Sequence, residues 1–154
     1  MMLLALVFLL APPVDWNPTF SKRPDGVLVV TLNVTRCLIT DAEVDSLPYT
    51  AKSAQACARI NRATAKTRTQ RRMRLPAGRF AFRVKNTDVP WVVDFALRGE
   101  HENGLPNTGG GKMKAGDVLD YVIDLRPGVY VFGSPLGGTP LYPLLVEQPA
   151  RRRR

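Results

Sequence analysis

Histidine and cysteine are scarce in this chain of 154 residues. It holds one histidine, His101, and two cysteines, Cys37 and Cys57. Zinc sites in proteins use about four nitrogen, sulfur or oxygen ligands, and no histidine lies near either cysteine in the sequence. Cys–His, Ser–His and paired-carboxylate patterns are also missing, so no general base or activated nucleophile stands out. We therefore expect no enzyme activity, no catalytic residue, no metal-binding residue and no cofactor.

An apolar run of about 20 residues, the length needed for a transmembrane helix, is missing as well. The chain begins with eleven apolar residues, 1–11, which are followed by two prolines. As a helix this segment would rise about 16 Å, which is short of the roughly 30 Å hydrocarbon core of a bilayer. The segment is therefore not a complete transmembrane span.

Different interpretations of residues 1–13 stay open. The segment has the length of the apolar region of a signal peptide, although a preceding basic segment and a clear small-x-small cleavage site are missing. Alternatively it is retained as an anchor in the bilayer interface or between partner helices, or it forms a buried core strand. As an anchor it would use Leu3, Leu4, Phe8 and the nearby Trp16, since aromatic side chains favour the membrane–water interface.

Acidic residues are absent between Lys52 and Arg79, where nine lysines and arginines occur. The tail Arg151–Arg154 adds four cations, and because the net charge is +9, the rest of the chain is mildly acidic. Such asymmetry suggests an anionic membrane surface or an acidic protein face as partner, although a solvated basic face is the plainer alternative. Nucleic acid is disfavoured because the segment has no aromatic residue for base stacking before Phe80.

The basic segment supplies the candidate electrostatic interface. Its members are Arg59, Arg62, Arg68, Arg71 and Arg72. We expect reversal of the last three to glutamate to weaken association without unfolding the protein.

Thirteen prolines and twelve glycines favour an all-β fold with frequent turns over a helical bundle. About seven short runs with alternating or β-branched composition, beginning at 26–34 and ending at 141–146, predict a β-sandwich. Residues 52–67 have helical composition, and the polar, glycine-rich stretch 98–111 reads as a loop. Its Thr108-Gly-Gly-Gly-Lys112 lacks the spacing of a phosphate-binding loop.

The expected organisation follows from these patterns. Residues 1–13 are the apolar signal or anchor segment, 14–25 an extended linker, 26–147 one domain, and 148–154 a basic tail. Residues 36–68 form an insertion whose helical part covers about 45–67. If the chain is exported, a disulfide between Cys37 and Cys57 is plausible, and two buried or free thiols are the alternative.

Several short motifs occur in an order that resembles the cupredoxin family. They are Pro76-Ala-Gly78, Asn86-Thr-Asp88, Asp94-Phe95, Lys114-Ala-Gly-Asp117 and Leu125-x-Pro-Gly128-x-Tyr130. The resemblance covers residues 69–147, with Val27–Val34 as a first strand, and implies a Greek-key β-sandwich.

Blue-copper members of that family bind copper through one cysteine, two histidines and a weak axial ligand such as methionine. The resemblance places these ligands at Val93, at Gly133 or Ser134, within Leu136–Gly138, and near Leu141. None of these residues is a usual copper ligand, so the resemblance implies a cupredoxin-like domain without copper.

These observations lead to a functional expectation. The chain is expected to be a non-catalytic, copper-free accessory or structural subunit docked on a bacterial membrane protein complex, respiratory or photosynthetic, on the periplasmic side of the inner membrane. A soluble periplasmic binding module and a metal-handling protein with a non-standard site are the alternatives. Lys22 and Arg23 follow the apolar segment and would favour the cytoplasmic side, whereas the resemblance favours the periplasm.

Overall fold

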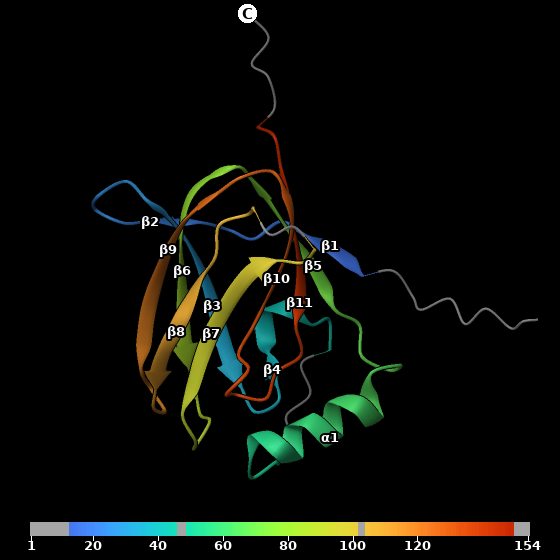
Figure 1. Ribbon diagram of the computed structural model, residues 1–154. Helices are drawn as coiled ribbons and strands as arrows, with labels where there is room; N and C mark the ends of the chain where they lie inside the picture. Colours follow the sequence, from blue (N-terminus) through green and yellow to red (C-terminus); the bar gives the residue numbers. More distant parts are fainter. Residues whose placement is uncertain (1–12, 46–48, 102–103, 150–154) are drawn as a thin grey trace, which may run out of the picture.

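The computed structural model describes residues 13–45, 49–101 and 104–149. These residues form two β-sheets packed face to face, with a single α-helix across one end of the sandwich (Figure 1). The helix lies below the two sheets in the view of Figure 1. The predicted all-β sandwich with a short helical insertion is confirmed.

The first sheet has six strands in the order β1-β5-β11-β10-β7-β8. Their bounds are Val14–Trp16 for β1, Arg71–Pro76 for β5, Tyr142–Glu147 for β11, Gly128–Gly133 for β10, Val93–Gly99 for β7 and Thr108–Met113 for β8. The central strand β11 runs parallel to β5 and antiparallel to β10. The sheet is therefore mixed, which requires connections that cross between the two layers.

The second sheet has the order β2-β3-β6-β9, with β4 paired to β3 beside this path. The bounds are Ser21–Lys22 for β2, Leu28–Thr35 for β3, Gly78–Asn86 for β6, Val118–Leu125 for β9 and Leu38–Ile39 for β4. Strands β3 and β6 are parallel and β6 and β9 are antiparallel. A 3-10 turn, η1, follows β4 at Thr40–Ala42.

The core lies between the two sheets because side chains alternate along each strand. In β6, Phe80, Phe82 and Val84 are buried, while Arg79 and Lys85 on the same strand are exposed. Phe82 stacks on Phe95 of β7 with ring centroids 5.9 Å apart, which joins the two layers. The alternation seen in the sequence therefore does set which side of each strand faces the core.

The helix α1 spans Ala54–Thr64. It begins after Ser53, whose hydroxyl accepts a hydrogen bond from the Ala56 backbone N–H at 3.1 Å and caps the first turn. It lies inside the expected helical stretch and is shorter at both ends. Cys57 is its buried residue, so α1 is attached to the sandwich along a narrow stripe.

Two stretches differ from the sequence-based expectation in detail. Residues 14–25, expected as an extended linker, are extended but carry β1 and β2, which pair at the edges of the two sheets. The loop expected over 98–111 ends early, because Thr108–Met113 form β8. Gly109 makes this possible, since a Cβ there would lie 2.4 Å from the Phe95 carbonyl oxygen.

Candidate functional site

The expected anchor residues Leu3, Leu4 and Phe8 lie outside the described residues. Trp16 is the last residue of β1 and pairs in register with Met73. It is half-buried and packs against the main hydrophobic core. Among the residues that the structure describes, no helix has both the length and the apolar character needed to cross a bilayer.

A hollow of about 410 Å³ opens beside Trp16, between the β1–β2 segment and the outer surface of β3. Its lining includes two aromatic residues, two groups that can be charged and three hydroxyl residues, namely Trp16, Phe20, Asp41, Arg71, Thr19, Ser21 and Thr31. Of the expected electrostatic residues, Arg71 is therefore the one that faces this hollow.

Arg72 holds the short strand β1 on β5. Its Nε donates to Asp15 Oδ1 at 2.8 Å, and Arg74 Nη1 lies 3.5 Å from the other carboxylate oxygen. The hydrogen bond from Arg72 lowers the pKa of Asp15 below its ordinary value. The charge of Arg72 is therefore already matched within the chain.

Arg68 is at the centre of a buried polar network. Its side chain is 9% exposed, and it forms a two-pronged ion pair with Glu43, whose side chain is 2% exposed. Arg68 also donates to the Cys37 carbonyl oxygen at 3.1 Å and to the amide oxygen of Asn61 on α1. This burial corrects the expectation that Arg68 can be reversed to glutamate without harm to the fold.

The network continues into the sandwich through Tyr142 of β11. The Tyr142 hydroxyl donates to Glu43 Oε2 at 2.6 Å and accepts from the Ile39 N–H at 3.1 Å. Burial raises the pKa of Tyr142 well above its ordinary value, and the negative charge of Glu43 adds to that rise. Burial lowers the pKa of Arg68, but its hydrogen bonds to Glu43 and the negative charge of Glu43 together outweigh burial and raise that pKa above its ordinary value.

The sequence gives no direct signal for this network. Arg68 and Glu43 are separated by 25 residues, and Glu43 and Tyr142 by 99. The local hint is a glutamate at the end of the turn that follows a short apolar strand, and this pattern is too common to be diagnostic.

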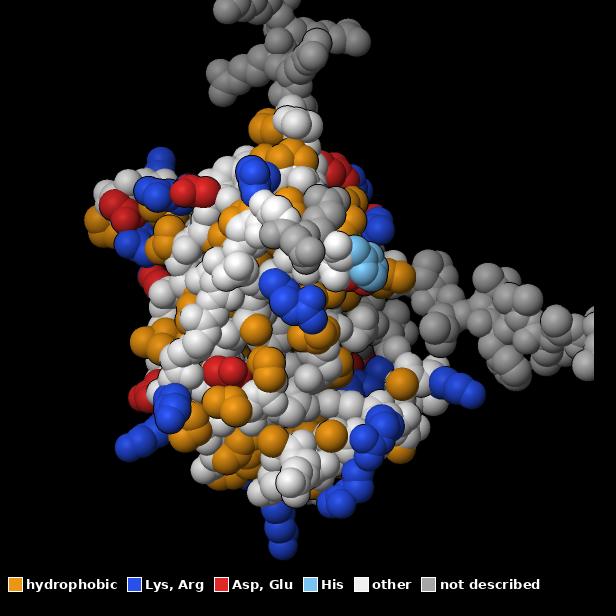
Figure 2. All heavy atoms as spheres, in the orientation of Figure 1, with side chains coloured by type: hydrophobic (Ala, Val, Ile, Leu, Met, Phe, Trp, Pro, Cys, Tyr) orange, Lys and Arg blue, Asp and Glu red, His pale blue; other side chains and the backbone are white. Residues whose placement is uncertain are grey.

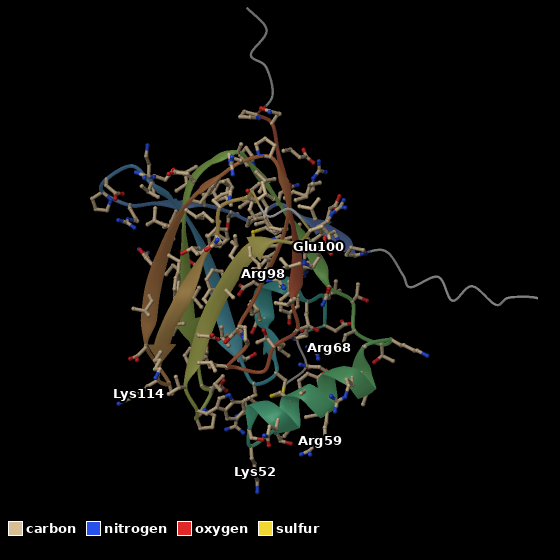
Figure 3. The ribbon with its side chains drawn as sticks, in the orientation of Figure 1. Lys52, Arg59, Arg68, Arg98, Glu100 and Lys114 are labelled. Atoms are coloured by element: carbon tan, nitrogen blue, oxygen red, sulfur yellow. A yellow bond between two sulfur atoms is a disulfide. The ribbon has the colours of Figure 1, made fainter. Side chains whose placement is uncertain are left out.

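Arg59 and Arg62 are the expected electrostatic residues that do lie at the surface. Both are on the exposed side of α1. Figure 3 shows Arg59 and the nearby Lys52 pointing away from the sandwich at its helical end, with Lys114 at the opposite corner of that end.

Cys37 and Cys57 form a disulfide, and both residues are fully buried. The bond links the turn after β3 to the first turn of α1, and Ala51 packs beside it. Arg68 donates a hydrogen bond to the backbone carbonyl oxygen of Cys37. The disulfide and the polar network therefore hold the same segment of the chain. Together they fix α1 against the end of the sandwich.

The positions that the cupredoxin resemblance assigns to copper ligands lie at this same end. Val93 is buried at the start of β7, where it pairs with Met113. Gly133 ends β10, and the loop from Ser134 leads to Leu141 just before β11. The loop thus lies beside the start of β7, directly above α1.

Ser134 and Asp94 organise the loop. The Ser134 hydroxyl lies 3.2 Å from Asp94 Oδ1 and accepts from the Gly137 N–H at 3.1 Å. Asp94 Oδ1 also accepts the Leu136 N–H at 2.9 Å, and the Ser134 N–H donates to the Thr139 hydroxyl at 2.8 Å. The loop backbone is therefore held by side chains at nearly every residue.

The loop and α1 are in close contact. A Cβ on Gly138 would lie 2.8 Å from Cys57 Cβ, and a Cβ on Gly137 would lie 2.5 Å from the Ser134 hydroxyl. Asn61 of α1 donates through Nδ2 to the Gly138 carbonyl oxygen at 2.8 Å. Side chains larger than glycine would not fit without movement of the helix or the loop.

His101, the single histidine of the sequence, lies away from this loop. Its side chain is 84% exposed and sits 3.6 Å from a Glu100 carboxylate oxygen. Within the described residues, no group of three or more histidine, cysteine, aspartate or glutamate side chains is placed to hold a metal ion.

Comparison with known proteins gives structural matches only. No protein-family model and no curated protein matches the chain. One similar solved structure is a multicopper oxidase, with 13% identity and a TM-score of 0.45 over 87% of this chain and 47% of that one. A second is the Cu-containing nitrite reductase from Thermus scotoductus SA-01, with 17% identity and a TM-score of 0.39 over 51% of this chain and 19% of that one.

A third similar structure is a laccase-like multicopper oxidase from the lignin-degrading bacterium Ochrobactrum sp. It has 12% identity and a TM-score of 0.45 over 90% of this chain and 30% of that one. The chain thus spans less than half the length of each of these structures. All three have cupredoxin-like folds, but similarity this low says nothing of activity. The fold is assigned from the two mixed sheets of the chain itself. These are consistent with an all-β cupredoxin-like sandwich.

Proposed function

We propose that this chain is a non-catalytic, copper-free accessory subunit that docks on a bacterial membrane protein complex at the periplasmic side. The observation that carries the proposal is the loop Ser134–Leu141, packed against α1 at the end of the sandwich where the family resemblance places a copper centre.

The donor chemistry at this loop supports the copper-free part of the proposal. Blue-copper centres need imidazole nitrogens and a thiolate. Val93, Gly133, Ser134 and Leu141 offer no such atoms, and both cysteines are joined to each other. Ser134, the one hydroxyl among these positions, is already engaged with Asp94 and the loop backbone. The residues present therefore do not fit a blue-copper centre.

The disulfide supports export. Disulfides persist in oxidising compartments such as the bacterial periplasm, and they are rare in the cytosol. The bond between Cys37 and Cys57 is buried and holds α1, so it is part of the fold and not an exposed reactive pair. A respiratory or photosynthetic complex is the partner class we favour, since such complexes work at this membrane.

The test has two measurements on the same material. The chain is isolated from detergent-solubilised membranes of its source cells and run on a native gel, and co-migrating proteins are identified by mass spectrometry. Purified protein is analysed for copper. Migration in a large assembly without stoichiometric copper is expected. Recovery only as a soluble 17.0 kDa species, or one bound copper per chain, would reject the proposal.

The hollow beside Trp16 favours a second candidate, a soluble periplasmic binding module. Aromatic residues and opposite charges at one concave site, here Trp16, Phe20, Asp41 and Arg71, are typical of sites for small polar ligands. Sequencing of the mature N-terminus separates the candidates, because removal of the apolar segment would exclude an N-terminal anchor and favour the soluble module.

A further inference from the structure

The helical end of the sandwich carries a small apolar surface. Leu136 is 48% exposed and Val92 is 36% exposed, although both have large apolar side chains. Val92 precedes Asp94 by two residues, and Asp94 Oδ1 accepts the Leu136 N–H at 2.9 Å, so the two exposed side chains lie near one another. Trp91 is half-buried next to Val92 and packs against both the main core and the disulfide cluster. The exposed side chains of Val92 and Leu136 are therefore next to well-packed residues.

Cations surround this apolar surface. Lys114 follows Met113, which pairs with Val93, so it lies next to Val92. Lys52 and Arg59 lie on the other side, just before and within α1, which contacts the loop at Gly138. Figure 2 shows hydrophobic side chains gathered at the lower end of the visible face with lysines and arginines around them, and Figure 3 labels the three cations at that end.

These cations differ from three arginines on the strands. Arg72, Arg79 and Arg83 each have a carboxylate partner on the neighbouring strand. Within the described ranges, the structure shows no ion pair for Lys52, Arg59 or Lys114. Helix α1 also contains no acidic residue, so the positive charge of this end is not compensated by the helix itself.

We propose that this end of the sandwich, called here the α1 end, binds a protein surface with an apolar centre and an acidic rim. The apolar centre of the α1 end is formed by Trp91, Val92 and Leu136. Its cationic rim is formed by Lys52, Arg59 and Lys114. The inference rests on the proposed function and specifies it, since it states which surface of this chain faces the complex and what the opposing surface contains.

A protein fits this surface better than a lipid headgroup layer. Leu136 is presented by a loop whose backbone is fixed by Ser134 and Asp94, so little conformational entropy is lost when a matching rigid surface binds. The half-buried Asp94 lies within the apolar centre, and its negative charge would be repelled by anionic headgroups but can be accommodated by a shaped protein surface. An apolar core with a charged rim is also the usual composition of protein interfaces.

The test uses membranes from source cells that lack this chain, and the fluorescently labelled full chain is titrated onto them. Leu136→Asp places a charge in the apolar centre and is expected to weaken binding about tenfold or more. Its matched control is Val129→Asp, since Val129 is 43% exposed on a different part of the surface. The control is expected to bind within about twofold of the natural chain.

The cationic rim is tested by Lys52→Glu/Arg59→Glu against Lys22→Glu/Arg98→Glu, which changes the net charge equally at exposed sites elsewhere. The rim pair is expected to weaken binding about tenfold at low salt, and the difference should shrink as ionic strength rises. Circular dichroism and thermal unfolding of each variant establish that the fold is retained.

Each outcome decides a different point. If both control variants weaken binding as much as the test variants, the α1 end is not the interface, while docking itself stands. If protein-free vesicles of the same lipids bind the chain equally well, the surface recognises lipid and the inference is overturned. If the natural chain binds neither membranes nor vesicles, the proposed function fails and this inference fails with it.

Discussion

Replacing Arg68 with methionine should destabilise the protein far more than removal of any surface arginine. The substitution keeps the long apolar part of the side chain but removes the guanidinium that neutralises Glu43, whose side chain is 2% exposed. Removing one member of a buried ion pair leaves an uncompensated charge and costs about 3–5 kcal/mol. Since small domains are stable by about 5–15 kcal/mol, this is a large share of the total.

Arg79→Met is the matched control. Arg79 forms an ion pair with Asp124 in which the two side chains are 61% and 72% exposed. Exposed pairs of this kind contribute about 0–1 kcal/mol, because water screens both charges. The two variants lose the same atoms, so the difference in unfolding free energy between them reports burial of the pair.

The assay is urea unfolding followed by tryptophan fluorescence, with the disulfide intact. A cycle with Glu43→Gln and the double variant Arg68→Met/Glu43→Gln measures the coupling, and the double variant should lose less than the sum of the single losses. A cost for Arg68→Met within about 1 kcal/mol of that for Arg79→Met would refute the buried network.

Three further predictions concern the same end of the molecule. Replacing Cys37 and Cys57 with serine should cost about 2–4 kcal/mol, and dithiothreitol should lower the melting temperature of the natural chain but not of the variant. Above about pH 10 Tyr142 loses its proton in the unfolded chain, whereas the buried hydroxyl of the folded protein keeps it. The free energy of unfolding should therefore fall by about 1.4 kcal/mol per pH unit. Urea unfolding at several pH values measures this slope, which should be less steep in Tyr142→Phe. Gly138→Ala should destabilise more than Gly116→Ala, by about 1–3 kcal/mol on thermal unfolding. Both glycines have positive φ, but a Cβ at Gly138 meets Cys57 while Gly116 faces open space, and equal losses would show that α1 does not pack on the loop.

The fold could be predicted where a pattern is local. Phe80, Phe82 and Val84 alternate with polar residues, and this period of two is enough to place β6 and its buried face. Helix α1 could be predicted from composition alone, but its ends depend on Ser53 and on contacts with Gly138, which lie far apart in the chain. Strand β8 was missed because glycines usually indicate a loop, whereas here the absence of a side chain permits close pairing with β7.

The candidate site was less accessible to sequence reasoning, because it depends on contacts between distant residues. The disulfide between Cys37 and Cys57 was foreseen as one alternative, and the structure contains it. The burial of Arg68 was not foreseen, since it depends on Glu43, Asn61 and Tyr142, which three separate elements bring together. A count of arginines along the chain cannot distinguish a cation buried in an ion pair from one that faces solvent.

That distinction determines where the positive charge of this protein can act. On the strands, cross-strand register places a carboxylate beside each of Arg72, Arg79 and Arg83, so these residues hold neighbouring strands together and have little charge left for a partner. Helix α1 has no neighbouring strand to supply carboxylates and contains none of its own. Lys52, Arg59 and Lys114 at this end have no ion pair within the described residues, and they lie near the exposed Leu136. This is the charge that the proposed interface at the α1 end would use to bind an acidic protein surface.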